Sequence, residues 1–407
     1  MTTTSPDLRP LSGLVVVEVG GTIPVAAATK LFSDYGADVV KVEPSGGASL
    51  RRIGPFPGDV PDLESGAFHV ALDTGKRSVT LDLDSPSGLE VLTRLAERAD
   101  LVLLHLPLGE ARTVREDLMV LGGAEGGPHV VVLSEHGLDG PFAGRRENGT
   151  SLFAWTGRMH QHSLPGEEPL RYAPYLPEMQ WGATAAAVSL ACVHSTEHGG
   201  QRREVEVSAV EALTGNVDTW FLQWEFTGAE MPRASGQSKA AYPAGCYRCA
   251  DGYVVFASAN PPFFNRLCEA IGRPELAEDP RFLTPAEKAL HFDDFFEVLD
   301  PWLRERTRDE IFTYLQSFGV MVSPMLDPSE VVTDRQAVAR GSFVTHELPA
   351  TRSEGGTTLL AGPPFRLDAA WDVAAAPRLG EHTDEVLREL GYTTTERLAL
   401  FRAGVTG

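Results

Sequence analysis

Apolar strand-like runs alternate with helical patterns in the first third of the chain, and this alternation is the feature that most narrows the fold. Near the N-terminus, LVVVEV is followed by VAAATKLFSDYGAD, whose apolar residues recur with helical spacing, and then by VVKVEP. Further strand-like runs follow in SVTLDLD, LVLLHL and HVVVLSE, with the amphipathic segment SPSGLEVLTRLAERAD between the first two. The alternation predicts an α/β fold with a mainly parallel sheet, helices on both faces, and ligands beyond the carboxyl ends of the strands.

The pattern changes in the second half of the chain. Residues 229–243 are polar and interrupted by Gly and Pro, and the strand-like runs of CYRCADGYVVFAS follow them. Three helical patterns come next, FFNRLCEAIG, FDDFFEVLDPWLRER and RDEIFTYLQSFG. This block, over roughly 230–325, predicts a second, smaller domain of the α+β class.

The charge of the chain excludes several classes of partner. The sequence has 35 Lys and Arg against 56 Asp and Glu, a net charge of −21. Such a surface repels phosphate backbones and anionic membranes, so we expect neither nucleic acid nor a membrane as a partner. No run approaches the roughly 18 apolar residues that span a bilayer, and the opening MTTTSPDLRP has no signal-peptide core. These features predict a cytoplasmic enzyme or binding protein, in which an anionic ligand needs a local basic pocket.

The four cysteines predict neither a disulfide framework nor a metal site. Four cysteines are too few for disulfide bonds to stabilise the fold of a chain of 407 residues. Cys246 and Cys249 have C-x-x-C spacing, but no second Cys or His pair lies at a matching distance. We therefore expect reduced thiols and no bound metal.

Glu178 occupies an unusual place in the segment YLPEMQWGATAAAVSLACV. It stands between Pro177 and a run of small and apolar residues that is typical of a closely packed helix. Ionised carboxylates are seldom buried without a partner. One interpretation is a stabilising charge in the first turn of the helix, favoured by the helix dipole, and the other is a catalytic carboxylate.

Several segments resemble the class III CoA-transferases, a family that includes formyl-CoA transferase, carnitine CoA-transferase and the α-methylacyl-CoA racemases. The resemblance opens with LSGLVVVEV, LFSDYGADVVKVEPSGGASLR and GKRSVTLDLDSPSGLEVLTRLAERADLVL. It continues in the same order through LDGPFAG, YPAGCYRCADGYVVFA, EDPRFLTPAEK and PRLGEHTDEVLRELGY, and so spans nearly the whole chain. The combination of GADVVKVE, GKRSVTLDL and LGEHTDEVL is specific to this family.

The resemblance implies an interlocked homodimer with two domains in each chain. A large Rossmann-like domain is expected over residues 1–228, with a C-terminal return to it over 329–407. A small α+β domain is expected over 229–328, between these two parts.

The resemblance also implies a catalytic position at Glu178. In the transferases an aspartate, in a D-x-x-x-G segment at a helix start, attacks the acyl-CoA thioester; here Glu178 and Gly182 match that segment. A glutamate can form the same acyl anhydride and then the same thioester with CoA. In the racemases a histidine assists, and its best match here is Asn148, an amide that takes up no proton at neutral pH. His160 and His162 lie nearby, in a polar H-x-H loop more typical of solvated side chains.

Coenzyme A, as the acyl-CoA co-substrate, is the ligand that the resemblance implies. Family members often place basic residues where this chain has Pro44 and Asp84, so other cations must hold the phosphates. The candidate phosphate partners, for each of which a solvated surface charge is the alternative, are Arg51, Lys76, Arg77, Arg112 and Arg115. The candidate adenine contacts, at strand ends, are Leu81, Leu83, His105 and Leu106.

Three functions remain open from the sequence. The first is an acyl-CoA:carboxylate CoA-transferase with Glu178 as nucleophile, helped by backbone amides of the loop RASGQSK over 233–239. The second is racemase-like proton transfer at the α-carbon of an acyl-CoA. The third is a divergent family member, enzyme or non-catalytic binding protein, that no longer uses CoA. The sequence identifies neither the acyl group nor the carboxylate acceptor.

Overall fold

The computed structural model divides into two compact units. It describes residues 9–107, 109, 113–118, 127–215, 219–231, 233, 237–239, 241–257, 260–348, 356–365, 367 and 372–407. The first unit comprises Met1–Met159, Arg171–Leu222 and Arg340–Gly407, and the second comprises His160–Leu170 and Gln223–Ala339.

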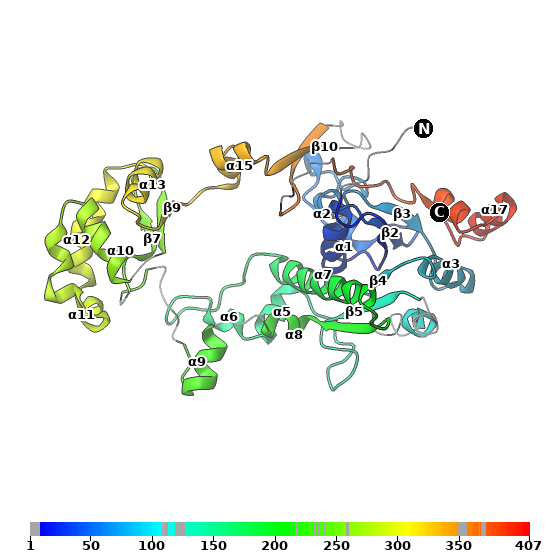
Figure 1. Ribbon diagram of the computed structural model, residues 1–407, viewed down its shortest axis with the longest axis horizontal. Helices are drawn as coiled ribbons and strands as arrows, with labels where there is room; N and C mark the ends of the chain where they lie inside the picture. The colour runs from blue at the N-terminus through cyan, green and yellow to red at the C-terminus, as the bar shows by residue number, and fades with distance from the viewer. Residues whose placement is uncertain are drawn as a thin grey trace. The chain divides into compact units, whose positions relative to one another are not determined.

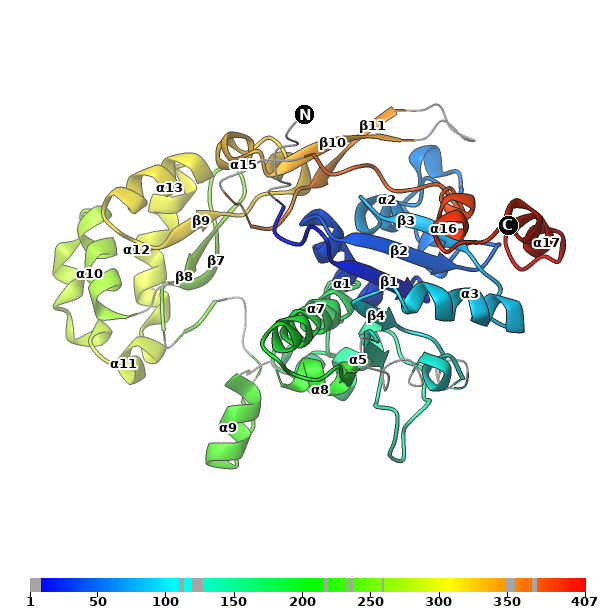
Figure 2. The ribbon, with the colours of Figure 1, turned by 45° about the vertical axis from the view of Figure 1, so that its right-hand side comes forward.

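The first unit is built on a six-stranded parallel sheet with the order β3-β2-β1-β4-β5-β6 (Figures 1 and 2). The strands are β1 (Val15–Val19), β2 (Asp38–Glu43), β3 (Arg77–Thr80), β4 (Leu101–Leu104), β5 (His129–Ser134) and β6 (Glu204–Ser208). In the register of the central strands, Val17 pairs with Val40 on one side and with Val102 on the other. The predicted α/β fold with a parallel sheet is confirmed.

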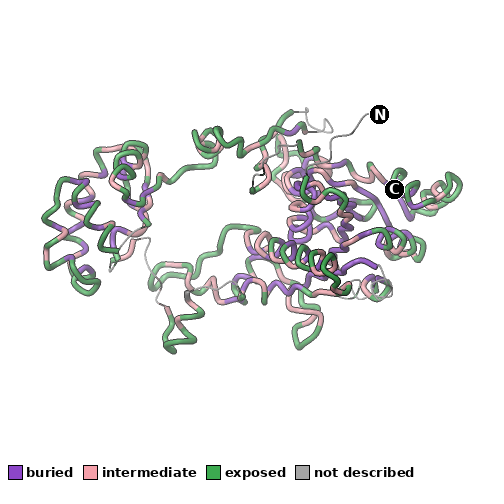
Figure 3. Tube along the Cα trace, viewed as in Figure 1, coloured by how far each residue is buried: buried purple, intermediate pink, exposed green. Residues whose placement is uncertain are grey.

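Both faces of the sheet are covered because the strands carry apolar side chains on both sides. Val17 and Val19 belong to a core with residues of α3 and α16, whereas Val16 belongs to a core with residues of α1, α7 and α8. Buried residues accordingly concentrate on the strands, as Figure 3 shows. The helices of this unit are α1 (Ile23–Asp34), α2 (Ala67–Leu72), α3 (Pro86–Ala96), α5 (Gly149–Trp155), α7 (Leu176–Glu197), α8 (Ala209–Thr214), α16 (Thr383–Glu389) and α17 (Thr394–Arg402). The short helix α6 (Arg158–Gln161) begins in this unit and ends in the second.

The long helix α7 packs closely along α1 (Figure 1). A Cβ atom added at Gly182 would lie 2.5 Å from the carbonyl oxygen of Pro24 and 2.9 Å from the Cβ of Ala27. Small residues continue along α7 at Ala185 and Ala186, both buried. The small-residue run therefore fixes the position of α7, and with it the first turn that carries Glu178.

The second unit is a smaller α+β structure. Its antiparallel sheet has the order β7-β8-β9, and its core is rich in aromatic side chains such as Tyr242, Phe264 and Phe295. Its elements are β7 (Ala244–Arg248), β8 (Tyr253–Ala257), α10 (Pro261–Ala270), α11 (Pro285–Leu290), α12 (Phe292–Arg304), α13 (Arg308–Ser317), β9 (Val322–Pro324), α14 (Pro328–Val331) and α15 (Arg335–Arg340).

A β-hairpin and one further helix belong to neither of these sheets. The hairpin of β10 (Phe343–Leu348) and β11 (Gly356–Ala361) is antiparallel, and α9 (Thr219–Thr227) spans the boundary between the units. Among the described helices, none has the length and apolar character that crossing a bilayer requires.

Candidate active site

Glu178 is the third residue of α7, in the first turn of that helix. Pro177 occupies the second helical position, where its fixed φ suits the first turn of a helix. The N-cap residue Tyr175 has a φ of 65°, in the left-handed region, so the chain changes direction directly before the helix begins. The first amides of a helix have no partner within it and form its positive end. The helix therefore stabilises a negative charge at this position.

The carboxylate of Glu178 meets a second helix start. The backbone N–H of Gly149, the first residue of α5, donates to Oε1 over 2.7 Å. The other oxygen, Oε2, is buried and makes no hydrogen bond within the described part of the chain. No described cation pairs with Glu178. One oxygen is thus anchored while the other keeps its lone pairs for another group.

Gly149 leaves just enough room for this contact. A Cβ atom at that position would lie 2.2 Å from Oε2 and 2.7 Å from Cδ of Glu178. Real Cβ contacts are essentially never that short, so the carboxylate rests directly on the α-carbon of the glycine. Sequence reasoning missed Gly149, and the signal available was its place directly after a capping residue.

Asn148 caps α5 from the residue before Gly149. Its side-chain Oδ1 accepts hydrogen bonds from the backbone N–H groups of Thr150 and Ser151 at 3.0 and 3.1 Å. The backbone N–H of Asn148 donates to Ser151 Oγ at 3.0 Å. This capping box fixes the start of α5 and hence the direction of the Gly149 N–H. The structure therefore brings the two predicted catalytic positions together, with Asn148 next to the Gly149 amide that contacts Glu178.

Apolar and aromatic residues surround the first turn of α7. Trp181 is buried, donates from Nε1 to the carbonyl of Val207 at 2.9 Å, and meets His105 edge-on at 4.8 Å between ring centroids. Tyr175 meets Phe68 edge-on at 4.6 Å. Because His105 follows β4 directly, these contacts place the first turn of α7 near the carboxyl ends of the strands.

His105 and Leu106 line a pocket of about 170 Å³ together with Glu135 and Arg146. His105 Nδ1 lies 2.7 Å from Thr22 Oγ1, and Nε2 lies 3.5 Å from the Glu135 carboxylate. Burial acts to raise the pKa of Glu135, but the neighbouring His105 outweighs it and holds that pKa below its usual value. Two predicted adenine contacts therefore share one pocket, and Arg146, which sequence reasoning missed, supplies its cation.

Arg51 and Lys76 lie in a buried ionic network of the first unit. Arg51 donates to both oxygens of Glu43 at 2.8 Å, and Lys76 contacts Glu18 at 2.7 Å and Asp73 at 2.9 Å. Burial acts to raise the pKa of Glu43, but Arg51 outweighs it and lowers that pKa to about 2. Phosphate binding by either cation requires these pairs to open, and that role stays a prediction.

The remaining candidates for CoA binding lie in different surroundings. Arg77 is partly exposed at the sheet edge and pairs with Asp38 at 2.5 Å and Glu389 at 2.9 Å. Leu81 is buried in the core beside α3, and Leu83 packs against the same core. Arg112 lies outside the described residues.

Arg115 and the loop of the second unit complete the predicted set. Arg115 pairs with Glu204 on β6. Arg233 donates to the carbonyls of His160 and Glu167, whereas residues 234–236 of the predicted oxyanion loop lie outside the described residues.

The fold and the site together define an α/β protein with a helix-start carboxylate poised near the carboxyl edge of a parallel sheet. The family model of CoA-transferase family III matches residues 11–383, so the chain belongs to this family. The predicted family is confirmed, and with it the prediction of a class III CoA-transferase whose substrates are unassigned.

Known relatives match nearly the whole chain. A formyl-CoA:oxalate CoA-transferase of Streptomyces coelicolor is 28% identical over 98% of this chain and 99% of its own length. A succinyl-CoA–D-citramalate CoA-transferase of Chloroflexus aurantiacus is 26% identical over 97% of both chains. The crystal structure of a CaiB/BaiF family protein from Brucella suis, 24% identical, matches the fold with a TM-score of 0.78 and covers 94% of this chain and 99% of its own.

Proposed function

We propose that the protein transfers CoA from an acyl-CoA to a carboxylate acceptor through a covalent intermediate on Glu178. The observation that carries the proposal is the state of this carboxylate: Oε1 is held by the Gly149 amide and Oε2 has no partner among the described residues. An unpaired carboxylate oxygen at a helix start is the group that a thioester carbonyl needs as a nucleophile.

The proposed reaction begins with attack of a Glu178 carboxylate oxygen on the thioester carbonyl carbon. A C–O bond forms, the C–S bond breaks, and CoA leaves as the thiolate, which produces a mixed anhydride. The thiolate then attacks Cδ of Glu178, releases the donor carboxylate and leaves a glutamyl-CoA thioester. The acceptor carboxylate attacks Cδ of this thioester, the C–S bond breaks, and a second mixed anhydride forms between Glu178 and the acceptor. The released CoA thiolate then attacks the acceptor carbonyl carbon of this anhydride, so that a new C–S bond forms and the C–O bond to Glu178 breaks, which frees the acceptor acyl-CoA and restores the Glu178 carboxylate.

Asn148 acts in this proposal as a positioning residue. Its side chain caps α5, and the first amide of α5 holds Glu178. An amide side chain takes up no proton at neutral pH, and no described histidine or second carboxylate is hydrogen-bonded to Glu178. The site therefore favours transfer over racemase-like proton movement, which needs two bases.

CoA is proposed to bind near the carboxyl ends of β4 and β5, where His105, Leu106 and Arg146 line one pocket. Arg146 offers a positive charge there that the positions of Pro44 and Asp84 do not provide. In a chain with a net charge of −21, a local cation of this kind is what retains an anionic cofactor.

We also propose that the protein works as a homodimer in the cytoplasm, with the predicted domain boundaries. Support for a second copy comes from α9, which exposes the large apolar side chains of Phe221, Leu222, Trp224 and Phe226, the last with 82% of its surface exposed. A monomer seldom leaves such a run open to water.

The test uses acyl-CoA donors and carboxylate acceptors of the kinds that the relatives name. Formyl-CoA and succinyl-CoA are offered with oxalate and D-citramalate, and CoA thioesters are separated chromatographically. Productive pairs are then repeated with hydroxylamine, which converts a glutamyl thioester or anhydride into a hydroxamate, located by peptide mass spectrometry. We expect modification at Glu178 only.

Variants at Glu178 separate the proposal from its alternatives. We expect Glu178→Gln to abolish transfer and trapping, and the matched control Glu90→Gln, at an exposed glutamate of α3, to change neither. Turnover without trapping at Glu178, or full activity of Glu178→Gln, contradicts the covalent mechanism. Deuterium uptake at the α-carbon without CoA transfer supports the racemase alternative, and no binding of CoA at millimolar concentration supports a member that no longer uses it.

A further inference from the structure

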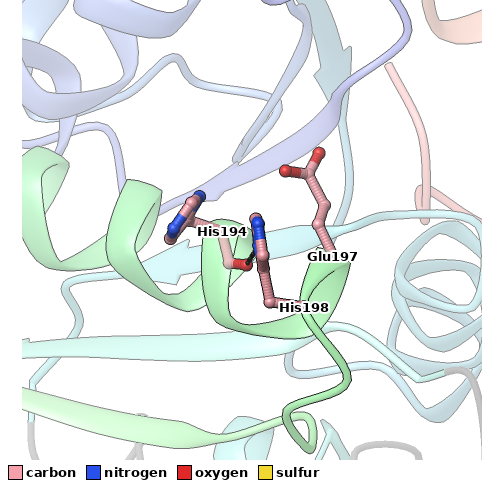
Figure 4. A group of neighbouring side chains, drawn as sticks. All are labelled: His194, Glu197 and His198. Carbon is pink, nitrogen blue, oxygen red and sulfur yellow. Dashed lines mark hydrogen bonds between the residues drawn. The ribbon is translucent and has the colours of Figure 1, made fainter.

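Three side chains that can ligate a metal ion gather at the C-terminal end of α7 (Figure 4). His194 lies in the last turn, Glu197 is the last helical residue and His198 is the C-cap. All three are exposed, and one ligand atom from each lies within 4.8 Å of the others. The His-x3-His spacing places both imidazoles on one side of the helix, with ring centroids 4.2 Å apart.

The tautomer of His198 is fixed by the structure in the form that binds a metal. His198 Nδ1 lies 2.9 Å from the backbone carbonyl oxygen of His194 (Figure 4). A carbonyl oxygen only accepts, so Nδ1 carries the proton and Nε2 keeps its lone pair. Metal-binding histidines commonly donate their other ring N–H to a backbone carbonyl in this way, which sets the ring orientation.

Helix electrostatics at this end also favour a cation. The last carbonyl groups of a helix have no partner within it and form its negative end. Glu197 adds a carboxylate beside the two imidazoles. The three side chains are exposed, so they can rotate about their outer torsions to approach the roughly 2.0–2.2 Å bond lengths that zinc requires.

We propose that His194, Glu197 and His198 form a binding site for a divalent transition-metal cation, with Zn²⁺ as the principal ligand. Two imidazoles and one carboxylate suit Zn²⁺, Cu²⁺ and Ni²⁺, and water fills the remaining coordination position. The site lies about 24–30 Å along α7 from Glu178, from the rise per residue of an α-helix. The bound ion therefore clamps the helix end and takes no part in the transfer reaction.

The binding test titrates Zn²⁺ into the full-length, chelator-treated protein in a non-coordinating buffer, followed by calorimetry. We expect saturable binding of one equivalent, weakened about 100-fold or more in the double variant His194→Gln/His198→Gln and about 10-fold in Glu197→Gln. The matched control is His160→Gln, which removes another exposed histidine beside a glutamate, Glu230, in a pair that belongs to no group of three possible ligands among the described residues. Its affinity for Zn²⁺ should equal that of the unmodified protein.

Two further readouts guard against metal binding elsewhere on the chain. Co²⁺ bound at the site should give visible d–d absorption that Zn²⁺ displaces and that the double variant lacks. Zn²⁺ should raise the thermal midpoint of the unmodified protein and leave that of the double variant unchanged. Binding that survives in the double variant, or no saturable binding at millimolar Zn²⁺, overturns the proposal. Because the three side chains are exposed, circular dichroism should show that the variants fold.

Discussion

Gly149→Ala tests the site geometry because it adds a single methyl group at the point where the carboxylate rests. The new Cβ would lie 2.2 Å from Glu178 Oε2, against an ordinary contact of 3.4 Å or more. The carboxylate must therefore move by about 1.2 Å, and the 2.7 Å hydrogen bond from the Gly149 amide is lost or lengthened. No other described atom lies nearer to the added methyl group than those of Glu178.

The expected effect falls on the rate and not on folding. A displacement near 1 Å of a catalytic group can cost ~100-fold in rate, which corresponds to about 2.7 kcal/mol in the activation free energy. The free energy of unfolding should change by less than about 1 kcal/mol, because alanine is a better helix former than glycine and the side chain that moves is only half-buried. Activity and stability are thus predicted to separate.

The assay compares kcat for CoA transfer, the yield of hydroxamate at Glu178 and the urea midpoint. Gly356→Ala is the control, since a Cβ there meets nothing within 4 Å and the residue has no positive φ. It should behave as the unmodified protein in all three measurements. A Gly149→Ala variant with unchanged kcat and trapping refutes the reasoning, because the carboxylate would then function without its observed position.

Three further predictions concern buried charges. Asp73→Asn leaves Lys41 and Lys76 without their shared carboxylate and should lower the free energy of unfolding by about 3–5 kcal/mol in urea titrations. The depressed pKa values of Asp73 and Glu43, about 2 for the latter, predict that stability is full above about pH 4.5 and falls progressively as the pH drops toward 2, measured by urea midpoints. Burial lowers the pKa of Lys288 to about 8, so Lys288→Met should be more stable than the unmodified protein at pH 7, and this difference should shrink between pH 8 and 10.

The sign for Lys288 follows from its two protonation equilibria. The unfolded chain keeps this amine protonated up to a pKa of about 10.4, whereas the folded chain releases the proton near pH 8. Below pH 8 both states bind the proton and the folded state bears the full cost of burying the charge. An advantage of Lys288→Met that stays constant from pH 7 to 10 contradicts this explanation.

The sheet could be predicted from the sequence because its strands are short, apolar on both faces and separated by helices. The start of α7 could also be predicted from the sequence, because Pro177 and the run of small residues after it mark the beginning of a closely packed helix. The contact between Glu178 and Gly149 could not be predicted. It joins residues 29 positions apart in the chain. It also depends on the relative position of the starts of α5 and α7, which is set by tertiary packing.

The buried ionic network could have been anticipated in part, because charged residues occur inside strands that are otherwise apolar. Glu18, Lys41 and Glu43 stand inside apolar strands, and charged residues in strands buried on both faces need partners of opposite charge. From the sequence, Arg51 and Lys76 are consistent both with phosphate partners and with solvated surface charges, because charge alone does not reveal which group a cation faces. The partners come from separate parts of the chain, and only the register of the sheet brings them together.

Asn148 offers the last test, because its side chain can be changed with or without loss of the helix cap. Serine is a good N-cap and alanine is a poor one, with a typical cost of about 1 kcal/mol. If Asn148 acts by fixing the Gly149 amide, Asn148→Ser should retain kcat and trapping at Glu178, whereas Asn148→Ala should lose both several-fold. If Asn148→Ser is as impaired as Asn148→Ala while its stability matches the unmodified protein, the amide group itself contacts the substrate, and a purely positioning role is wrong.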